Sequence, residues 1–233
     1  MKLKLQYCIG TKIETTKTKI IKMKTRLISL LCLVLLVGSI SAQTFEGKIT
    51  FGIDYELPEA MEAQRSMLPS EMSIYIAKDH VRIEQKTMMG EQNVITDTKS
   101  KISVLLMNMM GKKMAITMSD DGKEKPTPKI VYSKDTKTIA GYECKKATYI
   151  TQGEDGEQQE MEVYYTEEIP AEANDKLPGL KGYPLEYSIN AQGMLMTLVA
   201  KSVSKEKVSK KLFEIPEGYE EMSMEDFMKS MGQ

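Results

Sequence analysis

The sequence has no tryptophan and a single histidine, His80. Serine and cysteine hydrolases and catalytic zinc sites need one or more imidazoles, so these classes of enzyme are nearly excluded. Tryptophan, the usual aromatic platform for sugars, is absent, and no two carboxylates stand out as the catalytic pair of a glycosidase. The sequence therefore gives no indication of a glycosidase. By parity His80 shares one side of its strand with Arg82 and Glu84, and we expect an exposed histidine at a strand end. We predict a protein that is not an enzyme and has no catalytic residues, cofactor or resident metal ion.

Cysteine is also scarce, with three residues in the chain. Cys8 and Cys32 lie within the first 42 residues, which leaves Cys144 alone in the rest of the chain. A lone cysteine cannot form an internal disulfide, so the domain must be held together by its core. We expect Cys144 to be a half-buried structural residue, and the alternative is a reactive thiol or an intermolecular partner.

A secretory signal pattern occupies residues 23–42. Lys24 and Arg26 form a basic start, residues 27–37 are an apolar run, and small residues lead to Ala42. This order predicts a cleavable signal peptide, because the apolar run is shorter than the ~20 residues of a transmembrane helix. We therefore predict an exported protein, periplasmic or extracellular, without a transmembrane anchor. Residues 1–22 are interpreted as an upstream extension, with translation starting at either Met1 or Met23.

Charge is nearly balanced over the whole chain, with 32 basic and 33 acidic residues. Residues 1–42 hold eight of the basic residues and one acidic residue, so residues 43–233 carry 24 basic and 32 acidic residues, a net charge of −8. An acidic domain has no electrostatic attraction to phosphate backbones, which argues against nucleic-acid binding. A chain of ~190 residues can bury a core of its own, so residues 43–233 are predicted to form a single β-rich domain.

Strict alternation of apolar and polar residues is the strongest structural signal. Residues 45–55 alternate in this way, which predicts a strand with one buried face and one exposed face. Similar short stretches joined by Gly-containing turns follow, and they indicate about ten strands in an antiparallel meander. The strand predicted last is Leu212–Ile215, and residues 169–183 are predicted to be a long irregular crossing. Short helices are expected between Pro58 and Pro69 and after Ser223, which is placed to cap a closing helix.

Methionine is unusually common, with 17 of the 19 methionines in residues 43–233. A surface lined by flexible, polarisable methionine side chains adapts to ligands of varied shape. Three interpretations stay open: ordinary core packing, the lining of an apolar ligand cavity, and a thioether site for copper(I). If a cavity exists, the residues predicted to line it are Met107, Met114, Met118, Met194, Met196 and Leu198.

Four segments together resemble a family of exported proteins that is common in Bacteroidetes and catalogued as a domain of unknown function (number 4412). The segments are FEGKITF at residues 45–51, TIAGYECKKA at 138–147, GYPLEY at 182–187 and LFEIPEGY at 212–219. The resemblance implies a fold similar to that of periplasmic lipoprotein carriers of the LolA type. In that superfamily a strongly curved antiparallel sheet forms an incomplete barrel, with helices over a concave face that holds acyl chains. The family supplies no catalytic residues that can be transferred to this chain.

The resemblance and the methionines together predict a non-enzymatic protein that binds an apolar ligand, a lipid or an acyl chain, on the concave face of a curved sheet. Burial of hydrocarbon would drive such binding. One alternative is a structural or interaction module of the cell envelope whose interior is filled by its own side chains and which binds an envelope protein. A further alternative is copper(I) binding by methionine.

Overall fold

The computed structural model describes residues 45–231 except residues 89, 110, 120–126, 153–157, 175 and 192. These residues belong to one compact unit, Thr44–Gln233. The predicted upstream extension and signal peptide therefore lie outside the described residues, as does most of the loop near residue 120. No helix among the described residues is long and apolar enough to cross a membrane.

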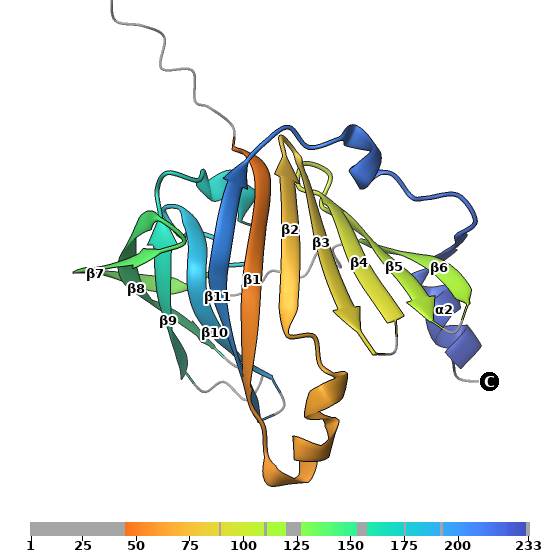
Figure 1. Cartoon of the computed structure of the whole chain (residues 1–233), viewed down its shortest axis with the longest axis horizontal. Helices are drawn as coiled ribbons and strands as arrows, with labels where there is room; N and C mark the ends of the chain where they lie inside the picture. Colours follow the sequence, from red (N-terminus) through yellow and green to blue (C-terminus); the bar gives the residue numbers. More distant parts are fainter. Residues whose placement is uncertain are drawn as a thin grey trace, which may run out of the picture. The chain divides into compact units, whose positions relative to one another are not determined.

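Twelve strands of the described chain form a single open sheet (Figure 1). Its order is β12-β6-β5-β4-β3-β2-β1-β11-β10-β9-β8-β7. The first half of the chain supplies β1 (Glu46–Glu56), β2 (Glu71–Ala77), β3 (His80–Thr87), β4 (Gly90–Asp97), β5 (Ile102–Met109) and β6 (Lys112–Ser119). The second half supplies β7 (Lys129–Ile139), β8 (Tyr142–Gln152), β9 (Gln158–Thr166), β10 (Tyr183–Ala191), β11 (Met194–Lys205) and β12 (Glu220–Ser223). The helical elements are η1 (Glu59–Met67), η2 (Ala171–Ala173), η3 (Lys210–Phe213) and α2 (Met224–Met231).

The alternating residues of β1 determine which face of the sheet is buried. Ile49, Phe51 and Ile53 are at most 5% exposed, whereas Asp54 on the other face is exposed. Across the sheet, Ile49 lies opposite Ile74 of β2, so the buried residues of neighbouring strands line up on the same side. We call this side the inner face. It holds most of the larger hydrophobic core.

The second half of the sheet curves back on itself. A bulge between Thr50 and Phe51 interrupts the pairing of β1 with β11, and bulges bend and twist the strands that contain them. The hairpin between β7 and β8 turns at Ala140 and Gly141, both with positive φ, and β7 returns into contact with β11. There the Lys205 ammonium lies 5.7 Å from the centre of the Tyr142 ring. The strands are thus arranged as an incomplete barrel rather than a flat sheet.

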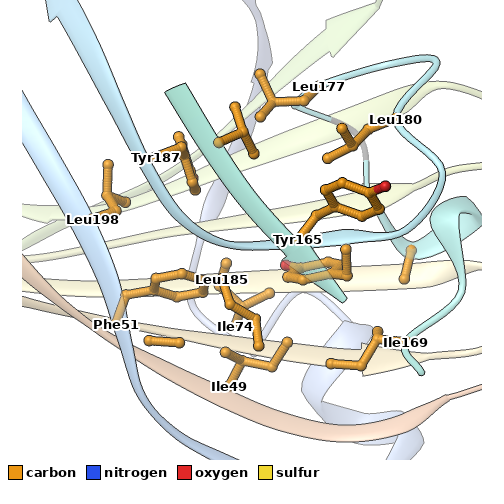
Figure 2. Close-up of a cluster of buried hydrophobic side chains, with 14 of the residues drawn as sticks. Ile49, Phe51, Ile74, Tyr165, Ile169, Leu177, Leu180, Leu185, Tyr187 and Leu198 are labelled. Carbon is orange, nitrogen blue, oxygen red and sulfur yellow. The ribbon is translucent and has the colours of Figure 1, made fainter. Parts of the chain in front are cut away.

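The crossing from β9 to β10 covers part of the inner face. Ile169, Leu177 and Leu180 are at most 5% exposed and join the core formed by the strands (Figure 2). The Tyr149 hydroxyl on β8 donates to the Pro178 carbonyl over 3.0 Å, which ties the crossing to the sheet. At Gly182 any side chain would collide with the Thr166 carbonyl, so only glycine allows the crossing to approach β9 this closely.

The opposite face, which we call the outer face, is covered over β3–β6 by the chain that follows β11. Phe213, Ile215 and Tyr219 pack there against a smaller core of Ile95, Leu106 and Ala115. The predicted strand at Leu212–Ile215 is wrong, because Leu212 and Phe213 belong to η3. The last strand is instead β12, which pairs in parallel with β6.

The last described element is α2, whose capping was correctly predicted. The Asp226 amide donates to the Ser223 hydroxyl over 3.1 Å, and that hydroxyl donates to the Asp226 carboxylate over 2.7 Å. The segment between Pro58 and Pro69 is also helical, but as the 3-10 helix η1. The prediction of a mainly β protein with a curved, open sheet and short helices is confirmed, and the sheet is antiparallel except where β12 pairs with β6. The strand count of about ten was slightly low.

Candidate functional site

The inner face contains a cavity of about 160 Å³. Side chains from β1, β2, β3, β10 and β11 line it, together with part of the crossing before β10. The aliphatic members are Ile74, Ile83, Ile189 and Leu198. Met72 of β2 and Met196 of β11 add two flexible thioether side chains. The cavity therefore lies where the central strand β1 joins the two halves of the sheet.

Aromatic rings form much of the remaining lining. Phe51, Tyr183 and Tyr187 each contribute to the cavity and are at most 5% exposed. Phe51 and Tyr187 make an edge-to-face contact, with ring centres 6.3 Å apart and planes inclined by 74° (Figure 2). Such aromatic pairs are rigid and add a favourable interaction beyond simple burial. The aromatic side of the cavity is thus held in place before any ligand arrives.

The polar part of the lining comes from the crossing. Asn174 stabilises a tight turn, because its side-chain oxygen accepts hydrogen bonds from the amides of Lys176 (3.2 Å) and Leu177 (3.0 Å). Its side-chain nitrogen donates to the Leu177 carbonyl over 2.7 Å. Leu177 is 5% exposed and anchors the turn in the core. Lys176 is the one lysine, arginine or acidic residue among the described residues that line the cavity, and it is exposed.

The described lining of this cavity consists mainly of hydrocarbon and aromatic side chains. Among the described residues, no group of three or more histidine, cysteine or acidic side chains is arranged to hold a metal ion. The cavity can accept an apolar group.

A second and more open hollow of about 420 Å³ lies towards the other end of the inner face. Met67 at the end of η1 and Leu68 just after it line this hollow with Gln92 of β4 and Met107 of β5. The two hollows lie along one row of inner-face residues. In that row Phe51, Met72, Gln85, Gln92, Met107 and Met114 are successive partners across six strands. The row is apolar at both ends and carries amide side chains in the middle.

The six residues predicted to line a ligand cavity do not all come together. Met196 and Leu198 line the 160 Å³ cavity, and Met107 lines the open hollow. Met107 is paired with Met114, whereas Met118 lies opposite Ser103 and Met194 lies opposite Ala191. β5 and β11 are five strand spacings apart, which is about 24 Å along the sheet. The ligand-binding role of these residues stays a prediction, as does copper(I) binding.

The aromatic members of the lining were not among the residues predicted from sequence. Phe51 lies in the first predicted strand, and Tyr187 lies in a later one. In that later strand Tyr187 and Ile189 share one face, and the polar Ser188 between them lies on the other. The alternation shows that both side chains point to a buried face. It does not show that β1 and β10 are separated by a single strand, because that depends on the pairing of β1 with β11.

The two residues considered for chemistry, His80 and Cys144, lie outside the cavity lining. His80 is half-buried, with its ring 5.5 Å from that of Phe213 on the outer face. Cys144 is fully buried in the core, more than the half-buried position expected. Burial raises the pKa of the Cys144 thiol from 9.0 to about 11. A thiol with a raised pKa is a poor nucleophile near neutral pH, which agrees with a structural role.

Comparisons with known proteins give a likeness in structure and none in sequence. No family model matches the sequence, and no curated protein matches it. The chain is similar in structure to LprF from Mycobacterium bovis, with 9% sequence identity and a TM-score of 0.34. The likeness covers 70% of this chain and 88% of the LprF chain. The resemblance to the domain of unknown function has no support from a family model and, like the carrier interpretation, stays a prediction.

Proposed function

We propose that this protein is an exported, non-enzymatic binding protein that holds an apolar ligand, such as part of an acyl chain, in the 160 Å³ cavity of the inner face. The observation that carries the proposal is an apolar hollow next to the buried core of the inner face. A core that keeps such a hollow favours a binding role over packing alone.

The size of the cavity limits what it can hold. An engineered apolar cavity of about 150 Å³ holds one benzene molecule, so this cavity has room for about six carbon atoms. Burying six methylene groups contributes about 5 kcal/mol, at ~0.8 kcal/mol each. This corresponds to a dissociation constant of roughly 0.1–1 mM for a small ligand. A larger ligand that also used the open hollow would bind more tightly.

A titration with 1-hexanol, followed by NMR of the isoleucine and leucine methyl groups, tests the proposal. We expect saturable shifts at Ile74 and Leu198 in the wild-type protein. Met196→Trp places a larger side chain in the cavity and should abolish these shifts. Met194→Trp is the matched control, because Met194 lies two residues away on the same side of β11 and does not line the cavity.

The wild-type result decides between binding and no binding. If 1-hexanol at about 10 mM, well above the expected dissociation constant, produces no saturable shift, the proposal is wrong. Equal loss of binding in Met194→Trp and Met196→Trp would mean that both substitutions disrupt β11 in general. The assignment of 1-hexanol binding to this cavity would then be wrong.

The second candidate is a structural or interaction module of the cell envelope with a filled interior. The observation in its favour is that Ile169, Leu177 and Leu180 already cover the inner face beside the cavity. The cavity is also smaller than the ~300–1,000 Å³ of typical small-molecule sites. Under this alternative, 1-hexanol would not bind, and Met196→Trp would raise the melting temperature because it fills unused space.

A further inference from the structure

We propose, resting on the apolar-ligand function above, that the ligand is a single-chain, uncharged amphiphile of about ten or more carbon atoms that extends from the cavity into the open hollow. Its apolar end lies in the cavity and its polar end lies in the hollow. Three features of the inner face support this class of ligand: the closeness of the two spaces, the side chains between them, and the lining of the hollow.

The cavity and the hollow are close neighbours on the inner face. Pro69 lines the hollow, and Met72, three residues later, lines the cavity. β3 likewise contributes to both spaces, with Ile83 in the cavity and Thr87 in the hollow. The cavity has room for about six carbon atoms. The further carbon atoms of a longer chain can therefore reach the hollow.

The Gln85 side chain of β3 lies between the two spaces. It is the cross-strand partner of Met72, which lines the cavity, and of Gln92, which lines the hollow. The Gln85 amide nitrogen donates to the Met72 sulfur over 3.3 Å. A thioether sulfur is a weak acceptor and the methionine side chain is flexible, so a hydrocarbon chain can displace this contact at little cost.

A row of aliphatic side chains runs beside this path. Its members are successive cross-strand partners from β2 to β5: Ile74, Ile83, Val94 and Leu105. Ile74 and Ile83 line the cavity. Val94 and Leu105 are half-buried, so the hydrocarbon surface continues beyond the cavity and is still partly exposed. A chain that leaves the cavity in this direction therefore buries more apolar surface.

The lining of the hollow determines which end of the ligand it suits. Gln64 and Gln92 line it, and both residues are exposed. Amide side chains supply hydrogen-bond donors and acceptors. None of the described residues that line the hollow is charged, and a charge that is buried without a counter-charge is costly. The hollow thus suits an uncharged end such as a hydroxyl group, and the aromatic and aliphatic cavity suits a methyl end.

An NMR titration that compares 1-hexanol with 1-decanol tests the proposal. Burial of one methylene group strengthens binding about four-fold, and half-burial in an open hollow strengthens it about two-fold. The four additional carbon atoms of 1-decanol therefore predict binding that is about 15- to 250-fold tighter than that of 1-hexanol. We expect 1-decanol to shift the methyl signal of Met107 as well as those of Ile74 and Leu198.

Met107→Trp fills part of the hollow and should reduce the advantage of 1-decanol over 1-hexanol to less than about three-fold. Met118→Trp is the matched control and should leave the advantage unchanged. Met118 is, like Met107, a half-buried methionine of the inner face, but it lies on β6 and lines neither space.

Nuclear Overhauser contacts between 1-decanol and the wild-type protein test the direction of the chain. We expect contacts from the terminal methyl group of the ligand to Leu198 and from its hydroxyl-bearing carbon to Met107. The reverse pattern would overturn the proposed direction.

The titrations separate failure of this inference from failure of the function on which it rests. If 1-hexanol binds and 1-decanol binds no more than about two-fold more tightly, the chain ends in the cavity, and the inference is wrong while the apolar-ligand function stands. If Met107→Trp and Met118→Trp reduce the advantage of 1-decanol equally, the hollow is not part of the site. If neither alcohol binds the wild-type protein, the apolar-ligand function itself fails.

Discussion

Replacing Ile169 by alanine tests whether the crossing between β9 and β10 is part of the core or a loosely attached cover. The Ile169 side chain is 0% exposed and packs with the inner-face residues shown in Figure 2. Removing a fully buried isoleucine side chain in this way costs about 2–5 kcal/mol, because the remaining cavity is only partly filled by relaxation. For a domain of this size each kcal/mol lowers the melting temperature by about 2–4 °C.

A loss of about 3 kcal/mol therefore predicts a melting temperature about 6–12 °C below that of the wild-type protein. Ile102→Ala is the matched control, since Ile102 is 44% exposed at the start of β5. That change should cost less than about 1 kcal/mol, from the lower strand propensity of alanine. Urea unfolding followed by circular dichroism measures both free energies of unfolding. Equal destabilisation by the two substitutions would refute the packing of the crossing described above.

Three further predictions concern the turn, the thiol and the outer face. Asn174→Ala removes three hydrogen bonds from the turn and should lower the free energy of unfolding by about 1–3 kcal/mol; a change within 0.5 kcal/mol in urea unfolding would contradict this. Cys144 should react with a thiol reagent at pH 8 only after unfolding, because a pKa of about 11 lowers the thiolate fraction about a hundredfold relative to an ordinary thiol. Since ionisation of this thiol favours the unfolded chain, its contribution to stability should be complete below about pH 9 and be lost as the pH rises towards 11, and Cys144→Ala should abolish that loss. Arg82→Ala leaves the Leu212 carbonyl without the 2.8 Å hydrogen bond from the guanidinium group, so trypsin should cleave faster around η3, while the exposed Arg65→Ala should not change the rate.

Local patterns predicted the strands well because alternation is a property of neighbouring residues. The first predicted strand, residues 45–55, differs by one residue from β1 at each end. The closing helix was predicted from the Ser223 and Asp226 pair, whose two hydrogen bonds are also local. The segment Leu212–Ile215 misled the prediction because its apolar residues face a distant partner, the outer-face core, rather than a strand neighbour.

The candidate site was less predictable because it depends on which strands are neighbours. Met196 and Leu198 were proposed and do line the cavity, since they alternate on β11 and β11 faces the core. Met107 and Met114 show the same alternation, yet β1–β4 separate them from β11. Phe51 contacts Tyr187 across β11, and no pattern within either strand specifies that arrangement. The turn at Asn174 was likewise not predicted, because it lies within residues 169–183, which were predicted to be irregular.

The position of β1 in the middle of the sheet has a consequence for the order in which the chain folds. β2–β6 and β7–β11 are two ladders in which each strand pairs with its neighbour in sequence, so each can form from local contacts. β1 pairs with its sequence neighbour β2, and the two ladders are joined by the pairing of β1 with β11, about 140–160 residues further along, for example at Gly47 and Lys205. Contacts between such distant segments form slowly, because a long loop must close first. The cavity takes its lining from both ladders, so in a stopped-flow refolding experiment the ability to bind 1-hexanol should emerge with the slowest phase, and its emergence in an earlier phase would exclude this order.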